Sequence, residues 1–342
     1  MTGKNKHVTI YDVAKALGVS TSTVSRAMRD HHSIGKATIK KVKKVALEMG
    51  YEPNAIASSL RKKRTKTIGV IVSYINRPFI SSLIRGIEEV ASKNMYNVII
   101  TQSLDSYKKE VEDVKIMYNS RVDGLIVSLA METTKYQHFQ PYLEMNYPLV
   151  FADRVAYEMD ADKVLIDNFS AAYEGTKHLI EQGYRNIAHL AGAQQRHIYS
   201  KRLEGYLAAL KDHGLKTRES LIYYSRLSHD DGRSGAETLL KQNVKPDAVF
   251  TANDTSAVGF MQYVEEAGLS IPQDMGIVGF NNDLISSIVR PQLTTIDHPG
   301  IEIGRKAAEL IIEKLLKKSL NTLPQTVTFQ TKLIVRGSSV KK

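Results

Sequence analysis

The feature that most constrains the fold is an alternation of short apolar segments with longer amphipathic ones from Thr67 onward. Near-continuous apolar strands separated by helices predict parallel sheets that are covered by helices on both faces. About 275 residues of this pattern exceed what a single sheet comfortably holds, so we expect two sheets. The strands are predicted at 67–73, 97–103, 123–130, 148–153, 163–168, 186–192, 247–253 and 275–281. The helices are predicted at 80–93, 107–119, 170–183, 202–213, 232–242 and 255–267.

The first 50 residues carry a different pattern, in which short amphipathic helices are separated by tight turns. Thr9 and Asp12 form a capping box, Gly18 ends the first helix, and Ser20 caps the second. A third helix is predicted over 36–49. The side chains expected to face inward are Ile10, Val13, Ala14, Leu17, Val24, Ala27, Met28, Ile39, Val42, Val45, Ala46 and Met49. Three such helices predict a helix-turn-helix bundle, whose second helix enters the major groove of DNA.

The net charge of +11 is confined to this end of the chain. Residues 1–66 hold 15 Lys and Arg against four Asp and Glu, whereas the remainder holds 32 of each sign. A small folded basic unit on a neutral body is typical of a protein that binds a polyanion, most often nucleic acid. Thr21, Ser22 and Arg26 are expected to point outward from the second helix, where hydroxyl groups reach bases and phosphates without bulk.

A short helix and a basic linker are predicted between these two parts. Pro53 can open a helix, and Ile56 and Leu60 lie one turn apart on it. The basic run 61–66 then marks a domain boundary. We therefore expect a helix-turn-helix domain at 1–52, a hinge helix with its linker at 53–66, and a two-lobed domain at 67–342.

Polar residues recur at the carboxyl ends of the predicted strands. They are Asn76, Asp153, Arg154, Asn253, Asp254, Asn281, Asn282 and Asp283, with Arg196 just past another strand. Ligands of open parallel sheets bind beyond these strand ends, so we expect a polar cleft between two lobes.

Composition and motifs argue against several other functions. The chain has no cysteine, which removes disulfides, thiolate metal sites and cysteine nucleophiles. It lacks the glycine-rich nucleotide motifs, the serine-hydrolase motif and the H-E-x-x-H zinc motif. No apolar run approaches the ~20 residues of a membrane helix, and the first residues do not resemble a signal peptide. We expect a cytoplasmic protein that is not an enzyme and needs no cofactor or metal.

The sequence resembles the lactose-repressor/purine-repressor (LacI) family of bacterial transcription regulators over essentially its full length. The most specific match is TIYDVAKALGVSTSTVSRAM, followed at the family spacing by GYEPNAIASSLRKKRTKTIGV. The body then matches in order with RPFISSLIRGIEE, RVDGLIV, VFADR, FTANDTSAVG, IPQDMGIVGFNN and PQLTTI. The resemblance implies an effector domain like the periplasmic binding proteins, and a homodimer that binds a palindromic double-stranded DNA operator under the control of a small metabolite.

The resemblance also implies roles for individual residues. Thr21, Ser22 and Arg26 match the base-reading positions, and Ser20, Thr23, Ser25 and Arg29 match positions at the DNA backbone. Ala57 and Leu60 match the hinge residues at the minor groove, where an apolar wedge kinks the duplex. The effector cleft is expected to be lined by Phe79, Ile80, Asp153, Arg196, Asn253 and Asn281.

Three departures from the family pattern bear on the ligand and on assembly. Asn281 stands where many members have Asp, so Arg196 would be less neutralised and a carboxylate or phosphate on the ligand would be favoured. Asp254 or Asp283 would restore the balance, and a neutral sugar would then fit as well. Leu227 lies near a position that is often aromatic, which weakens the case for ring stacking. No heptad extension follows VRGSS, so a dimer is expected.

Two other classes of protein share parts of this pattern. The body alone resembles a sugar-binding protein of a transport system, but the fused basic bundle argues against that function. An α/β enzyme tethered to DNA is disfavoured by the missing catalytic motifs. Retention on DNA at low salt distinguishes the first alternative, and turnover of a bound ligand would reveal the second.

Overall fold

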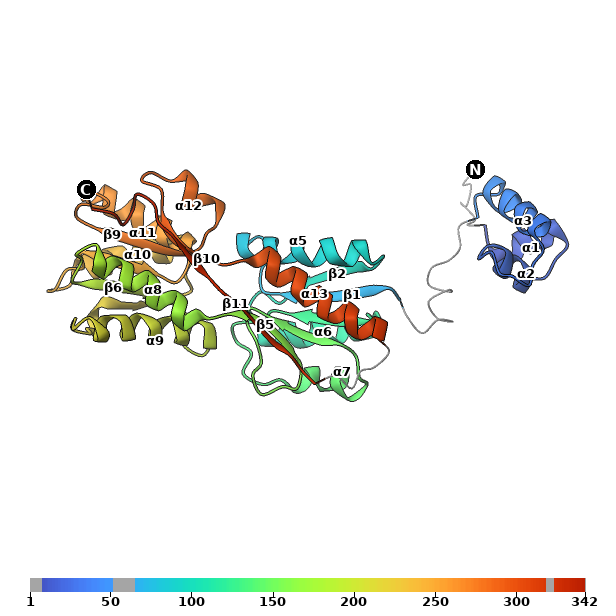
Figure 1. The fold of residues 1–342 in the computed structure, drawn as a ribbon, viewed down its shortest axis with the longest axis horizontal. Helices are drawn as coiled ribbons and strands as arrows, with labels where there is room; N and C mark the ends of the chain where they lie inside the picture. Colours follow the sequence, from blue (N-terminus) through green and yellow to red (C-terminus); the bar gives the residue numbers. More distant parts are fainter. Residues whose placement is uncertain (1–7, 52–64, 318–322, 342) are drawn as a thin grey trace, which may run out of the picture. The chain divides into compact units, whose positions relative to one another are not determined.

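The chain divides into two compact units, Met1–Thr65 and Lys66–Lys342. The computed structural model describes residues 8–51, 65–317 and 323–341. Figure 1 shows the helices of the smaller unit, and sheets covered by helices in the larger one. The predicted hinge residues Ala57 and Leu60 lie outside the described residues.

The smaller unit contains the three predicted helices, α1 (Ile10–Leu17), α2 (Thr21–Ala27) and α3 (Lys36–Glu48). At the start of α1 the Asp12 carboxylate accepts hydrogen bonds from the Thr9 N–H at 2.8 Å and from the Thr9 hydroxyl at 2.7 Å. Gly18 ends α1 with a φ of 64°, a left-handed conformation that glycine adopts without strain. The Ser20 hydroxyl accepts from the Thr23 N–H at 3.1 Å and caps α2.

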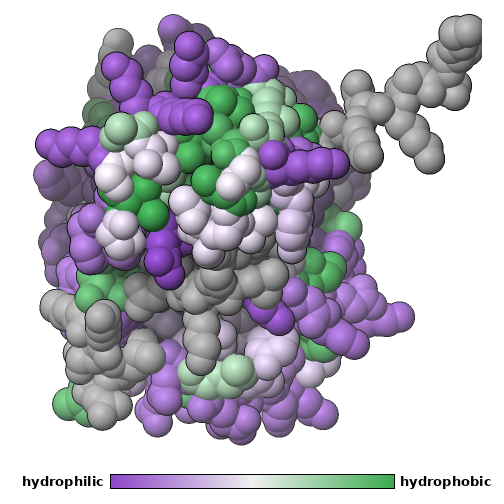
Figure 2. All heavy atoms as spheres, turned by 90° about the vertical axis from the view of Figure 1, so that its right-hand side faces the viewer, coloured by the Kyte–Doolittle hydropathy of each residue, from purple (hydrophilic) through white to green (hydrophobic). Residues whose placement is uncertain are grey.

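The core of this unit confirms the predicted inward faces except at Val45, which is only half-buried. Its buried members are Val13, Ala14, Val24, Ala27, Val42 and Ala46. Two large apolar side chains, Tyr11 and Leu47, remain exposed. Figure 2 shows a face on which hydrophilic side chains surround a smaller group of hydrophobic ones. A core this small leaves most of the helical surface polar and available for binding.

The larger unit contains two six-stranded sheets, as predicted. We call the part built on the first sheet the N-lobe and the part built on the second sheet the C-lobe. In the N-lobe the strand order is β11 (Thr326–Phe329), β5 (Asp162–Ile166), β4 (Leu149–Ala152), β3 (Gly124–Val127), β1 (Thr67–Val72) and β2 (Asn97–Gln102). In the C-lobe it is β12 (Lys332–Ile334), β10 (Thr294–Asp297), β9 (Gly276–Asn281), β8 (Ala248–Thr251), β6 (Ile187–Ala191) and β7 (Ile222–Tyr224). Neighbouring strands are parallel except β10 and β12.

Helices cover both sheets (Figure 1). The N-lobe carries α5 (Pro78–Lys93), α6 (Tyr107–Asn119), the 3-10 turn η1 (Gln137–Phe139), α7 (Gln140–Glu144) and α13 (Gly300–Lys317). The C-lobe carries α8 (Asn168–Glu181), α9 (His197–Asp212), the 3-10 turn η2 (Glu219–Leu221), α10 (His229–Leu240), α11 (Asp254–Glu266) and α12 (Leu284–Ile288). The chain therefore crosses between the lobes three times: after β5, after β10 and after β11.

All the predicted strands and helices of this unit are present. The structure also contains several strands and helices that the sequence pattern did not predict. The missed strands are β7, β10, β11 and β12, each three or four residues long. Such segments hold too few apolar residues for a periodicity to stand out. The missed helices are α7 and α12, which have five residues each, and the long helix α13, which carries the chain back to the N-lobe.

Helices α5 and α13 pack closely because glycine stands at their contact. A Cβ atom added at Gly86 would lie 2.0 Å from the Ile301 carbonyl oxygen, and one added at Gly304 would lie 2.1 Å from the Leu83 carbonyl oxygen. Both neighbours are backbone atoms, which cannot move aside cheaply. This packing holds α5, the helix that follows β1, against α13.

We expect Gly86→Ala to destabilise the larger unit by about 1–3 kcal/mol, because the added methyl group overpacks a backbone contact. Urea unfolding followed by circular dichroism measures this change. Ser92→Ala, on the exposed face of the same helix, serves as the matched control and should leave the free energy of unfolding unchanged. Equal stability of the two variants would contradict the packing argument.

Candidate functional site

The expected base-reading residues lie together on α2. Ser22 and Arg26 are exposed and Thr21 is half-buried. Val24 and Ala27, which face the core, hold the opposite side of the helix. The structure therefore brings hydroxyl groups and one guanidinium to a single accessible surface, as a helix that reads base edges requires.

The residues expected at the DNA backbone are not all accessible. Ser20 and Thr23 join their hydroxyl groups at 2.9 Å at the start of α2. Ser25 is buried, and its hydroxyl accepts from Arg29 Nη2 at 2.6 Å while its carbonyl accepts from Arg29 Nε at 3.0 Å. The expectation that Ser25 faces a phosphate is thus corrected, because this hydroxyl serves to orient Arg29.

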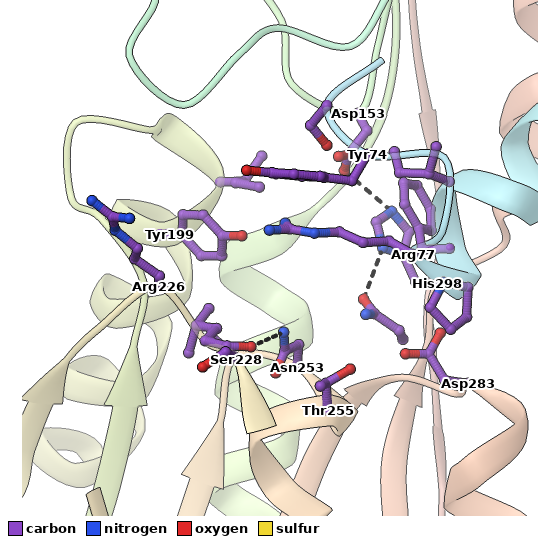
Figure 3. A pocket seen from close by; sticks show the side chains of 18 of the residues that line it. Tyr74, Arg77, Asp153, Tyr199, Arg226, Ser228, Asn253, Thr255, Asp283 and His298 are labelled. Atoms are coloured by element: carbon purple, nitrogen blue, oxygen red, sulfur yellow. Dashed lines mark hydrogen bonds and ion pairs between the residues drawn. The ribbon is translucent and has the colours of Figure 1, made fainter. Parts of the chain in front are cut away.

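A cavity of about 450 Å³ lies at the carboxyl ends of strands from both lobes (Figure 3). Five of the six expected effector residues line it: Phe79, Ile80, Asp153, Asn253 and Asn281. Parallel strands present their ends at one edge of a sheet, which explains why residues so distant in sequence meet here. The Asn253 side chain already has hydrogen-bond partners within the protein: its Nδ2 donates to the Leu227 carbonyl at 2.9 Å, and its Oδ1 caps α11.

Asp153 and His298 form a buried polar pair in this cavity. Asp153 Oδ1 lies 3.5 Å from His298 Nε2, and neither atom has a hydrogen-bond partner among the described residues. Burial raises the pKa of Asp153, and the charges of Arg154 and Arg202 oppose that effect. Burial also lowers the pKa of His298 well below its usual value, with a further contribution from Arg202. Two unsatisfied buried polar atoms are costly, so a ligand hydroxyl that bonds to them gains affinity.

Arg202 provides a buried guanidinium that the sequence analysis overlooked. Its Nε donates to Asn168 Oδ1 at 2.8 Å and its Nη1 donates to the Ala252 carbonyl at 2.6 Å. The guanidinium carbon lies 3.5 Å from the centre of the Phe280 ring. Burial lowers the pKa of Arg202 to about 10. Because this pKa is still far above neutral pH, Arg202 keeps its positive charge beside the cavity, and both of its hydrogen-bond acceptors are neutral.

Arg196 does not line this cavity. It precedes α9 in the C-lobe, and its Nη2 donates to the carbonyl of Thr133 in the N-lobe. The Thr133 hydroxyl in turn donates to the buried Glu110 carboxylate at 2.8 Å. The side chain expected to bind the effector is therefore a contact between the lobes, and the expected imbalance between Arg196 and Asn281 does not arise within the cavity.

Aromatic side chains line the cavity despite Leu227. Leu227 lines the wall as an aliphatic residue, as the sequence shows, but Tyr74 and Tyr199 also face the cavity (Figure 3). The Phe79 ring stacks on His298 with ring centres 3.9 Å apart. Tyrosine offers both an apolar face and a hydroxyl, which suits a ring that carries hydroxyl groups.

The cavity residues that sequence reasoning missed include Tyr74, Arg77, Tyr199, Arg202, Arg226 and His298. For some of them a signal existed. Arg77 adjoins Asn76, which was already placed at a strand end, and the periodicity of α9 puts Arg202 one turn from Ile198 on the inward face. Arg226 and His298 follow β7 and β10, strands that were themselves missed.

Neither a metal centre nor a membrane span is apparent in the part of the chain that the structure describes. Residues 8–51, 65–317 and 323–341 contain no group of three His, Asp or Glu side chains that could bind a metal ion. Within the same ranges, no helix is long and apolar enough to cross a membrane.

We expect Asp153→Asn to raise the free energy of unfolding near pH 7 by about 1–3 kcal/mol, because it removes a buried carboxylate with an unpaired oxygen. In the unfolded chain Asp153 ionises near pH 3.9, whereas the folded chain holds the proton to higher pH. The cost of burying the charge is thus absent in acid and grows as the pH rises through the raised pKa.

Urea unfolding across this pH range measures the effect. The stability difference should shrink toward zero at about pH 4, and the exposed Asp160→Asn should show no such trend. A destabilised Asp153→Asn protein near pH 7 would contradict the argument.

Two family models match the chain. Residues 9–54 match the bacterial regulatory proteins of the lacI family, and residues 65–335 match the periplasmic binding proteins and sugar-binding domain of the LacI family. The chain is 34% identical to catabolite control protein A of Priestia megaterium, over 95% of this chain and 98% of the relative. It is 32% identical to the ribose operon repressor of Haemophilus influenzae, over 96% of this chain and 98% of the relative.

Solved structures agree with these matches. The lac repressor dimer bound to operator and the anti-inducer ONPF is 25% identical, with a TM-score of 0.87, and the match covers 98% of this chain and all of that one. The complex of the transcriptional regulator CelR with cellobiose is 27% identical, with a TM-score of 0.73, and covers 97% of this chain. The helix-turn-helix unit, the two-lobed body and these likenesses lead to one conclusion: the chain belongs to the LacI family of bacterial regulatory proteins.

Proposed function

We propose that this protein is a transcription repressor that binds a palindromic operator as a homodimer under the control of a small metabolite. The observation that carries the proposal is the cavity between two lobes, joined in one chain to a basic helix-turn-helix unit. A ligand in such a cavity contacts both lobes and alters their closure, and a two-state element of this kind can transmit binding to a distant domain.

The unpaired Asp153 and His298 atoms, with Tyr74 and Tyr199, favour a hydroxylated ligand such as a sugar or sugar derivative. CelR is solved with cellobiose and a related regulator from Enterococcus faecium with ribose. The same family of folds thus accommodates sugars, and the chemistry of the present cavity is compatible with that class.

Exposed apolar side chains on both lobes support assembly into a dimer. On β2, at an edge of the N-lobe sheet, Ile99 and Ile100 are 38% and 41% exposed. On α12 of the C-lobe, Leu284 and Ile288 are 74% and 56% exposed. Large apolar side chains at an unpaired strand edge of one lobe and on a helix of the other favour burial against a second copy of the chain.

The remaining assignments follow from this function. We place a DNA-binding domain at 1–52, a hinge with Ala57 and Leu60 at 53–66, and the effector-binding and dimerisation domain at 67–342. A regulator of DNA acts in the cytoplasm, and the proposed role requires no catalysis. Binding of the full chain to a random DNA library tests the proposal: enriched palindromic sites are expected, and enrichment without sequence preference would overturn it.

We expect the operator affinity to fall steeply with salt, because the basic side chains of the first 66 residues release counterions from the phosphates. Each released counterion contributes about −0.9 to the slope of log affinity against log salt concentration. Fluorescence anisotropy of a labelled operator measures the slope. Affinity that is unchanged between low and physiological salt would contradict this electrostatic contribution.

Substitutions of two arginines, one on α2 and one just after it, distinguish contacts with bases from contacts with the DNA backbone. Arg26→Ala should cost about 1–3 kcal/mol on the selected operator and relax the preference at one base position. Arg29→Ala, which removes the side chain oriented by Ser25, should weaken binding equally on all sequences. Competition between operators with single base changes measures both effects, and an equal loss on every sequence for Arg26→Ala would make Arg26 a phosphate contact.

A further inference from the structure

The cavity holds more positive than negative side chains. Four guanidinium groups line it, from Arg77, Arg154, Arg202 and Arg226, against the two carboxylates of Asp153 and Asp283. Burial raises the pKa of both carboxyl groups, that of Asp283 to about 6. Burial thus disfavours the charged form of both carboxyl groups, while the arginines stay charged.

Nearby acids compensate only part of this charge. Asp105 Oδ1 accepts from Arg154 Nη1 at 2.5 Å, so this carboxylate is largely committed to Arg154. Its other oxygen lies 3.5 Å from Arg77 Nη2, at the limit of a hydrogen bond. Arg202 bonds only to neutral oxygen atoms, and Arg226 forms no ion pair within the described residues. Asp105 therefore forms ion pairs with two of the four guanidinium groups.

The two arginines of the cavity that are not buried come from opposite lobes, whereas Arg154 and Arg202 are buried. Arg77 directly precedes α5 in the N-lobe, and Arg226 lies in the C-lobe loop between β7 and α10. In Figure 3 Arg77 extends across the cavity below Tyr74, toward the wall that holds Tyr199 and Arg226. Each follows the carboxyl end of a strand, and neither was singled out for its charge in the sequence.

From this arrangement we infer that the effector is an anionic sugar derivative, whose carboxylate or phosphate is bound by Arg77 and Arg226. The inference rests on the proposed function and specifies its ligand. The anionic group occupies the side of the cavity near Tyr199, and the hydroxyl groups of the ligand bond to Asp153 and His298. Because the two guanidinium groups belong to different lobes, the anion also draws the lobes together.

Inorganic phosphate is the first probe. We expect sodium phosphate to raise the melting temperature of the full chain above its value in sodium chloride of equal ionic strength. The double variant Arg77→Gln/Arg226→Gln should lose this difference. Arg218→Gln, which removes a guanidinium outside the cavity lining, should keep it. A difference that is absent in the original protein, or that survives in the double variant, would overturn the inference.

Matched sugars distinguish the two anionic groups. Calorimetry with D-glucose, D-glucuronate and D-glucose 6-phosphate compares a neutral, a carboxylate and a phosphate ligand on one ring. We expect the better anionic member to bind about tenfold more tightly than glucose, or to bind where glucose does not, and the double variant to lose that preference. Three equal affinities, a preference for glucose, or no binding of any member would count against the inference.

The proposed function is tested separately by operator binding of the same preparation. Sequence-specific DNA binding without any preference for anions would overturn the inference alone. Loss of sequence-specific DNA binding would overturn the proposed function, whatever the cavity binds.

Discussion

The functional architecture depends on one topological constraint: the carboxyl ends of two parallel sheets face a common space. The chain satisfies this constraint by crossing between the lobes three times, after β5, β10 and β11. Each crossing is short, so the lobes can change their closure only about these few residues. His298 lies on the second crossing and contacts Asp153 from the N-lobe and Asn281 from the C-lobe. The cavity and the connection that governs closure therefore share a residue.

Burying charged groups in this space costs free energy, and a ligand that binds to these groups offsets part of that cost. Asp153, Arg202 and His298 are almost fully buried. Burial shifts the pKa of each in the direction that favours its neutral form, upward for Asp153 and downward for Arg202 and His298. A structure selected for stability alone would replace such groups by apolar ones. Their presence at the junction of two lobes is typical of a binding site, where polar atoms left without partners specify what may enter.

The two units divide the electrostatic work of a regulator. The basic excess of the first 66 residues supplies attraction to a polyanion, and the balanced body leaves local charge as the main determinant of what its cavity binds. Arg196 has a different role from the cavity arginines. It joins the two lobes of the chain by donating a hydrogen bond to the Thr133 carbonyl, and it does not line the cavity. In the smaller unit Ser25 and Arg29 play a comparable part, because one positions the other.

By itself the sequence determined the helix-turn-helix unit, the two parallel sheets and polar residues of the cavity such as Asp153 and Asn281. These features depend on local periodicity, on caps and on the rule that parallel strands present their ends together. Phe79 and Ile80 were expected from the family resemblance alone. Only the tertiary structure decided that Arg202 rather than Arg196 lies at the cavity, that Ser25 is buried, and that Arg77 faces it with Arg226. Those outcomes depend on the direction in which each side chain leaves its helix or loop and on the partner it finds across a lobe. Local periodicity indicates the first only for a helical residue such as Arg202, and it does not indicate the second.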